Sequence, residues 1–108
     1  GAIAPGMGIA ADALFRLAAR LYQVEFVRPP RAIGKNTMHA VQSGLIFGYV
    51  GLVEGIVRRI QAELDRRAVV IGTGGLAVVI AEETSVIEHV EPNLTLEGLR
   101  IVYRLNET

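Results

Sequence analysis

The fold is decided by Val69-Val70-Ile71-Gly72-Thr73-Gly74-Gly75, which runs directly into Leu76-Ala77-Val78-Val79-Ile80-Ala81. The first run predicts a buried strand that breaks on glycines, and the second run predicts a helix. Glycines at such a junction let a flat ligand lie against the backbone, beside free N–H groups of the first helical turn. The pattern is typical of a nucleotide pocket, although plain chain reversal or close packing explains such glycines equally well.

Composition describes one well-cored globular domain or part of one. Of the 108 residues, 51% are hydrophobic and 20% are charged. Eleven basic and eleven acidic residues cancel, so no overall basic field attracts nucleic acid or an anionic membrane surface. Cysteine is absent, which excludes disulfides and thiol chemistry and fits a cytoplasmic protein. We therefore expect a cytoplasmic protein with no nucleic-acid partner.

Two further expectations concern membranes and the start of the chain. The longest apolar tracts, Gly44–Val57 and Ala68–Ala81, fall short of the ~20 residues that span a bilayer, and the first contains Glu54. We expect no membrane insertion on that ground. The chain opens on Gly1 inside a glycine-rich turn and without Met, so we expect a fragment whose upstream part is missing.

Hydrophobic periodicity and turn residues predict a helix-rich α/β order. The expected elements, in chain order, are a loop over Gly1–Gly8, a helix over Ala10–Leu21, a short extended piece over Val24–Val27, a long helix over Met38–Arg66, a strand over Val69–Ile71, a helix over Gly75–Thr84, an extended piece over Val86–Val90 and a helix with Thr95 as its N-cap that runs to about Leu105.

A stripe of four glycines runs along the long predicted helix, at Gly44, Gly48, Gly51 and Gly55. Each glycine in a helix interior costs ~1 kcal/mol relative to Ala, so the four together cost roughly 4 kcal/mol. Close approach of another backbone is the physical candidate for compensation. That backbone belongs either to a neighbouring element of the same fold or to the same helix of a second subunit, and the pattern favours neither.

The common catalytic motifs are absent. No Gly-x-x-x-x-Gly-Lys-Ser/Thr phosphate loop and no Gly-x-Ser-x-Gly nucleophile turn occur. His39 and His89 lie far apart without acidic or cysteine neighbours, so the sequence predicts no metal site. Glu54 is best explained by an i,i+4 ion pair with Arg58. No general base is identifiable among these residues.

Five segments nevertheless form a pattern by their order and spacing: Gly1-Ala2-Ile3-Ala4-Pro5-Gly6, Ile33-Gly34-Lys35-Asn36-Thr37, Gln42-Ser43-Gly44 with Gly48-Tyr49-Val50-Gly51, Thr73-Gly74-Gly75 and Leu94-Thr95-Leu96-Glu97-Gly98-Leu99. Together they resemble the C-terminal portion of type III pantothenate kinases, of the Bvg accessory factor family and the acetate kinase/sugar kinase/Hsp70/actin superfamily. The resemblance covers essentially all 108 residues. It implies the C-terminal part of a ribonuclease H-like, actin-like ATPase kinase fold. Residues 1–108 would be a partial C-terminal domain, with the N-terminal domain absent.

The resemblance also implies a function and its site residues. Such kinases phosphorylate pantothenate with ATP in the first step of coenzyme A biosynthesis, as homodimers that use Mg²⁺ and a monovalent cation, K⁺ or NH₄⁺. Their Thr-Gly-Gly turn contributes to the adenosine site, which implies this role for Thr73, Gly74 and Gly75. Their Ile-Gly-x-x-Thr loop brings a threonine near pantothenate across the dimer interface, which implies Thr37. The Gly-x-Ile-x-Pro-Gly segment borders the cleft, which gives Ile3 and Gly6 lesser roles in binding substrate.

Two elements of the resembled family do not occur in this chain. They are the Asp-x-Gly-Asn-Thr phosphate loop and the Gly-x-Asp-Arg segment, whose aspartate acts as the base. We therefore expect the catalytic residue upstream of Gly1, in a missing N-terminal half, and we expect the 108 residues alone to be inactive. The alternative is a non-catalytic dimerising or regulatory module of the same fold.

Overall fold

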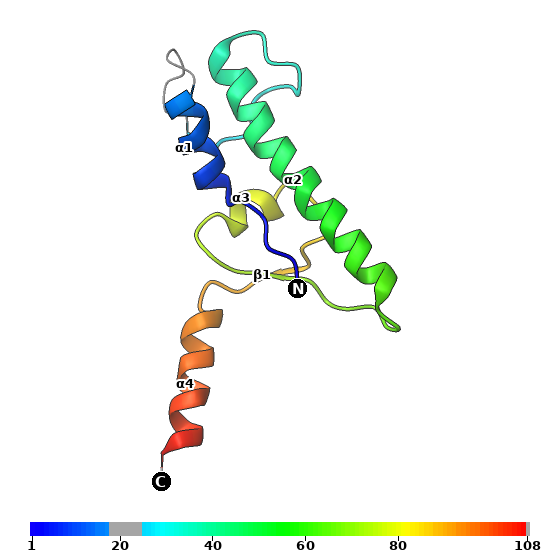
Figure 1. The fold of residues 1–108 in the computed structure, drawn as a ribbon, viewed down its shortest axis with the longest axis vertical. Helices are drawn as coiled ribbons and strands as arrows, with labels where there is room; N and C mark the ends of the chain where they lie inside the picture. The colour runs from blue at the N-terminus through cyan, green and yellow to red at the C-terminus, as the bar shows by residue number, and fades with distance from the viewer. Residues whose placement is uncertain (18–24, 108) are drawn as a thin grey trace.

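Helices make up most of the chain in the computed structural model, which describes residues 1–17 and 25–107 (Figure 1). The elements are α1 (Met7–Leu17), α2 (Thr37–Glu63), β1 (Ile71–Gly72), α3 (Ala77–Ala81), β2 (His89–Val90) and α4 (Leu94–Asn106). The two strands pair in parallel, with Ile71 opposite His89 and Gly72 opposite Val90. The α/β prediction is thus confirmed at a coarse level, as a helix-rich chain with a small parallel sheet.

The long helix α2 is the centre of the packing, and α1 and α3 contact it (Figure 1). Its buried face follows helical spacing, because residues three or four positions apart on a helix lie on the same face. The core apolar residues are Met7, Ala11, Val41, Leu45, Ile46, Val50 and Ile80. The core therefore joins α1 and α3 to one face of α2.

The last helix, α4, projects away from this body (Figure 1). No other helix or strand of the described residues contacts it. The radius of gyration is 17.0 Å. A compact chain of this length would have a radius of gyration of about 13 Å. The elongated shape follows from the isolated position of α4.

The first two helices differ slightly from the predicted bounds. α1 begins at Met7 instead of Ala10, so the N-terminal loop is shorter than expected, and the predicted end at Leu21 lies outside the described residues. Residues 25–27 form a tight turn instead of an extended piece, since the amide of Val27 donates to the carbonyl of Glu25 at 2.8 Å. α2 ends at Glu63 instead of Arg66 because Leu64 already has extended backbone angles.

The elements after α2 are shorter than predicted, apart from α4. The strand occupies Ile71–Gly72, and α3 covers only Ala77–Ala81 of the predicted Gly75–Thr84. The end of α3 tightens, because the amide of Glu83 donates to the carbonyl of Ile80 at 3.0 Å. α4 begins at Leu94 with Asn93 in the N-cap position, so the N-cap predicted at Thr95 is wrong by two residues.

The glycine stripe on α2 faces open space within this chain. A Cβ atom placed on Gly44, Gly48, Gly51 or Gly55 would meet none of the described atoms within 4 Å beyond the helix itself. The possibility that a neighbouring element of this chain covers the stripe is therefore wrong for the described residues. The alternative, that the same helix of a second subunit covers the stripe, stays a prediction.

α2 also bears on the membrane prediction. By length and composition alone, α2 is long enough and apolar enough to cross a membrane. The core helix of a soluble protein passes the same test. The argument from short apolar tracts used Gly44–Val57, whereas the helix that passes this test runs from Thr37 to Glu63. The absence of membrane insertion stays a prediction.

Candidate functional site

The glycine turn lies between β1 and α3, where the sequence placed it. Gly74 has φ +100°, a backbone conformation that residues with a Cβ atom rarely adopt. Its carbonyl accepts a hydrogen bond from the amide of Ala77 at 3.3 Å, which closes the turn. The hydroxyl of Thr73 donates to the carbonyl of Glu91 at 2.8 Å and so ties the turn to the segment that follows β2.

The first turn of α3 was expected to offer free N–H groups to a ligand. α3 has five residues, and the amide of Ala77 is already bonded to the carbonyl of Gly74, while that of Ile80 donates to the carbonyl of Leu76. The expectation that the other amides of this turn are free to meet a ligand stays a prediction, and the exposed backbone of Gly74 and Gly75 lies beside them.

A cavity of about 490 Å³ opens in front of the glycine turn. A Cβ atom at Gly74 or Gly75 would meet nothing within 4 Å, so a ligand can approach the backbone directly. The lining residues are Gly6, Met7, Gly8, Ile9, Tyr49, Val53, Gly72, Thr73, Gly74, Gly75, Leu76, Ala77, Ile80 and Ile87. The volume lies within the range of about 300–1,000 Å³ that is usual for small-molecule pockets.

The lining of this cavity carries no charged residue. A flat, largely apolar group such as a purine ring fits that chemistry, because pockets for small molecules are mostly apolar with a few polar groups that orient the ligand. A triphosphate does not fit it, since phosphates need cations or several backbone amides. The cavity is therefore a candidate for the nucleoside part of a nucleotide.

Residues far apart in the sequence meet at this cavity. Gly6, which was predicted to border the substrate cleft, lines it together with Thr73-Gly74-Gly75, which were predicted to bind the nucleotide. Tyr49 and Val53 of α2 also line it, and sequence reasoning placed them only among the core positions of a helix. Periodicity separates a helix's buried side from its exposed side, but it does not separate a core position from a cavity wall.

Ile3 lies apart from the cavity. It is 103% exposed in the extended segment before α1, and it is absent from the lining. The structure therefore gives Gly6, but not Ile3, a place beside the glycine turn.

Thr37 is the first residue of α2, and the neighbouring Asn36 is the N-cap. The Oδ1 atom of Asn36 accepts from the amide of His39 at 2.8 Å, and its Nδ2 atom lies 3.2 Å from Nδ1 of His39. This contact identifies Asn36 as the residue that caps the helix. Thr37 is exposed, so its hydroxyl is accessible at the surface.

The loop before Thr37 is packed tightly against the first turns of α2. A Cβ atom on Gly34 would lie 2.5 Å from Cα of Ala40 and 2.7 Å from the carbonyl carbon of His39. Further along, the hydroxyl of Ser43 donates to the carbonyl of Ala32 at 2.5 Å. Gly34 is therefore the glycine at which close backbone approach is observed, and it places the residues that lead into Thr37.

The structure does not bring Thr37 to the glycine turn. Thr37 is not among the lining residues of the glycine cavity. Twelve positions of α2 separate it from Tyr49, which does line that cavity. At 1.5 Å per residue this is a separation of about 18 Å along the helix axis. The two predicted binding elements therefore occupy different regions of one chain.

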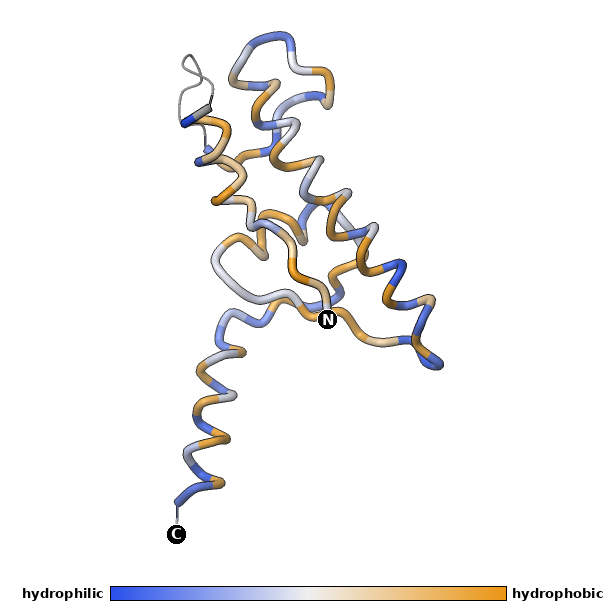
Figure 2. Tube along the Cα trace, viewed as in Figure 1, coloured by the Kyte–Doolittle hydropathy of each residue, from blue (hydrophilic) through white to orange (hydrophobic). Residues whose placement is uncertain are grey.

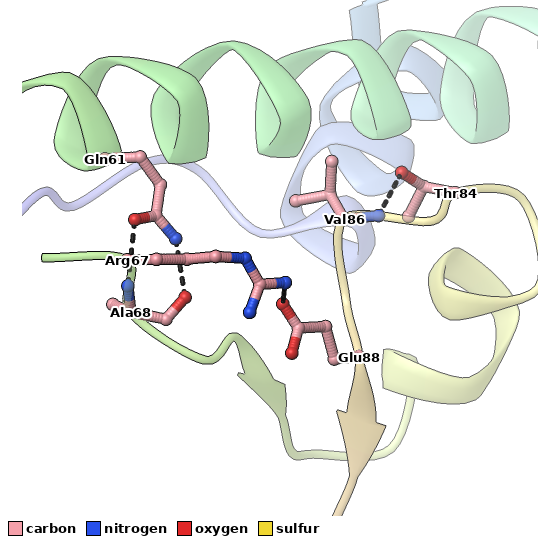
Figure 3. Close-up of polar contacts among 6 residues, drawn as sticks. All are labelled: Gln61, Arg67, Ala68, Thr84, Val86 and Glu88. Carbon is pink, nitrogen blue, oxygen red and sulfur yellow. Dashed lines mark hydrogen bonds and ion pairs between the residues drawn. The ribbon is translucent and has the colours of Figure 1, made fainter.

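A larger and more polar cavity, of about 570 Å³, lies at the C-terminal end of α2. Figure 3 shows its framework: both side-chain amide atoms of Gln61 bond the backbone of Ala68, at 2.6 and 3.0 Å, and Arg67 pairs with Glu88. These contacts fold the chain back after α2, which explains why the helix ends early. The cavity shares no residue with the glycine cavity.

Glu54 has the structural role predicted for it. Its carboxylate lies 3.4 Å from Nη2 of Arg58 and accepts a hydrogen bond from Thr84 at 2.8 Å. The hydroxyl of Thr84 in turn accepts from the amide of Val86 at 3.2 Å (Figure 3). Glu54 therefore connects α2 to the segment between α3 and β2.

No group of three His, Cys, Asp or Glu side chains that could hold a metal ion occurs within residues 1–17 and 25–107. His39 contacts Asn36, and His89 lies in β2. This part of the chain therefore supplies no ligand set for Mg²⁺ by itself.

Comparisons with known proteins agree with the motif pattern. A family model described as type III pantothenate kinase matches residues 1–59. Proteins named type III pantothenate kinase from Roseiflexus sp. (strain RS-1), Roseiflexus castenholzii and Moorella thermoacetica are 67%, 67% and 59% identical to the chain. The matches cover 100%, 98% and 98% of this chain and 42% of each relative. The chain thus spans about two fifths of the length of these curated relatives.

Proposed function

The chain belongs to the type III pantothenate kinase family. From that premise we propose that it forms the nucleoside-binding part of an enzyme that phosphorylates pantothenate with ATP, the first step of coenzyme A biosynthesis. The observation that carries the proposal is the uncharged cavity of about 490 Å³ in front of the glycine turn. Family membership supplies the reaction, and the cavity supplies a place for the base and sugar of ATP.

In this proposal each residue of the turn has its own role. Gly74 and Gly75 let the adenosine lie against the backbone, because no side chain occupies that space. Thr73 holds the turn in place through its hydrogen bond to Glu91. Gly6 contributes the facing wall. ATP, when bound, supplies the phosphoryl group, and the uncharged lining implies that its phosphates extend away from this cavity.

Thr37 is proposed to contact pantothenate across a dimer interface. Its exposed position at the start of α2, distant from the glycine cavity, supports a contact made toward another subunit's site. The open glycine stripe on α2 supports a homodimer, because small residues allow two backbones to approach closely and a two-fold axis brings a patch onto its own copy. Ile3, exposed before α1, is proposed to border the same cleft.

The remaining parts of the machinery are proposed to lie outside this chain. Phosphoryl transfer needs bound phosphates, metal and an oriented nucleophile. The described residues provide no metal-ligand cluster, so Mg²⁺ and the monovalent cation, K⁺ or NH₄⁺, are assigned to polypeptide beyond this chain. The catalytic base and phosphate loop are assigned to an N-terminal half, and the complete protein to an actin-like, ribonuclease H-like fold in the cytoplasm, without nucleic-acid or membrane partners.

The test is a kinase assay on two proteins. The first is the 108-residue chain alone, and the second is a hybrid in which this chain replaces the matching residues of the Roseiflexus sp. relative. We expect ATP-dependent phosphorylation of pantothenate by the hybrid and none by the chain alone. A folded hybrid that binds no ATP and has no activity would contradict the proposal and favour a non-catalytic dimerising or regulatory module. Activity of the purified chain alone would contradict the assignment of the base.

A further inference from the structure

α4 is an amphipathic helix without a partner. None of its residues is buried, and no other helix or strand of the described residues contacts it. Figure 2 shows hydrophobic residues recurring along its whole length. Leu99 is 62% exposed and Tyr103 is 67% exposed. Isolated helices of this length are marginal in water, so its apolar surface needs a cover.

The apolar surface of α4 is unusually wide. Each residue turns a helix by about 100°, and on this spacing Glu97, Arg100 and Arg104 fall within a sector of about 60°. The apolar residues spread over an arc of about 220°, whose edges are Ile101 and Leu96. A helix that packs on one side has an apolar stripe of roughly 100°. The apolar residues of the arc are Leu94, Leu96, Leu99, Ile101, Val102, Tyr103 and Leu105.

We propose that α4 is embedded in an apolar core within a single, family-length molecule. The polypeptide that forms this core is the part of such a molecule that this chain does not match. The relatives provide that polypeptide, because this chain spans only 42% of their length. The width of the arc distinguishes this cover from the alternative, a second copy of α4. A second copy of α4 would cover one side of the helix, whereas an arc of about 220° needs apolar neighbours on two sides.

The polar sector of α4 agrees with this orientation. Arg100 and Glu97 pair with each other at 2.7 Å, so neither charge needs a partner from the covering polypeptide. Arg104 lies in the same narrow sector, and an embedded helix can keep such a charged sector in water while it buries its apolar side chains.

Embedding α4 also affects the glycine turn. Asn93 precedes α4, and two residues earlier the carbonyl of Glu91 accepts from Thr73, while the amide of Glu91 donates to Gly72 at 2.9 Å. The segment before α4 is thus held to Gly72 and Thr73, at the β1 side of the glycine turn. A docked α4 therefore fixes the segment against which the turn is anchored.

The test is hydrogen exchange of the α4 amides in the hybrid with the Roseiflexus sp. relative. We expect the amides of α4 to exchange about a hundredfold more slowly than those of an unstructured peptide. The exchange rate should not depend on protein concentration. Leu99 and Ile101 are two residues apart and point roughly 160° away from each other, so they probe opposite sides of the arc. Leu99→Ala and Ile101→Ala should each accelerate exchange by roughly thirtyfold or more.

Arg104→Ala is the matched control, because it lies in the charged sector and should change exchange by about threefold or less. Three results would overturn the proposal. The first is fast exchange in the unsubstituted hybrid, which needs no variant to fold. The second is protection that grows with protein concentration, which would assign α4 to a second copy. The third is acceleration in only one of the two alanine variants, which would mean one-sided docking.

Discussion

Gly34 gives the sharpest test of how the sequence fixes this structure. It lies in the loop before α2, and a Cβ atom there would sit 2.5 Å from Cα of Ala40 and 2.7 Å from the carbonyl carbon of His39. Ordinary contacts between carbon atoms are about 3.5–4.0 Å, so Gly34→Ala forces an overlap of roughly 1 Å. Both neighbours are backbone atoms of a helix, which cannot rotate away as a side chain can.

The size of the effect follows from what has to move. Overpacking at a rigid site costs about 1–3 kcal/mol, and the upper end applies where only backbone can yield. If the loop shifts instead, the hydrogen bond from Ser43 to the carbonyl of Ala32 is lost, at about 1 kcal/mol. We therefore expect Gly34→Ala to lower the free energy of unfolding by about 3 kcal/mol.

The assay is urea unfolding followed by circular dichroism, with Gly44→Ala as the matched control. Gly44 is exposed on α2, and a Cβ atom there meets nothing within 4 Å. In the 108-residue chain at low concentration, Gly44→Ala should raise the free energy of unfolding by up to about 1 kcal/mol. The same chemical change should thus have opposite signs at the two positions. Equal stability of Gly34→Ala and the unsubstituted chain would refute the reasoning from close packing.

Three further predictions concern the hybrid with the Roseiflexus sp. relative. Gly75→Val should weaken ATP binding, measured by calorimetry, at least about tenfold while leaving the melting temperature nearly unchanged, because the added side chain meets only the cavity. Thr37→Ala should raise the Michaelis constant for pantothenate without loss of stability, whereas the control Asn36→Ala should lose about 1 kcal/mol of stability as the cap is removed. Gly48→Leu should shift the protein from dimer to monomer in analytical ultracentrifugation, and an unperturbed dimer would contradict the proposed role of the stripe.

The fold was predictable where local chemistry decides it. The start of α2 was predicted within one residue, where Asn36 caps the helix. Its C-terminal end was predicted within three residues, because its apolar spacing is regular. The turn at Gly74 was placed at the correct position, because only glycine adopts its backbone angle without strain. Local signals of this kind do not depend on the rest of the molecule.

The parts that failed depend on contacts between distant residues. α3 is an exception, because it is shortened by local hydrogen bonds from the amides of Glu83 and Thr84 to the carbonyls of Ile80 and Ala81, which apolar sequence alone does not reveal. Tyr49 was recognised as a helix position but not as a cavity wall, since that role requires the glycine turn to lie beside α2. Gly34 was quoted as part of a motif, yet its steric role appears only when the loop is folded onto the helix.

The glycine stripe of α2 and the apolar arc of α4 are two exposed surfaces that fit different partners. The glycine stripe of α2 has no side chains, so what fits it is a closely approaching backbone, and its uncompensated cost is roughly 4 kcal/mol. The arc of α4 carries large side chains, so what fits it is an apolar core with room for them. In the two proposals made above, a second subunit covers the glycine stripe by two-fold symmetry, and the rest of a family-length molecule covers the arc of α4. If both covers exist, removing one should leave the other: Gly48→Leu should abolish the dimer while the exchange protection of α4 persists in the monomer.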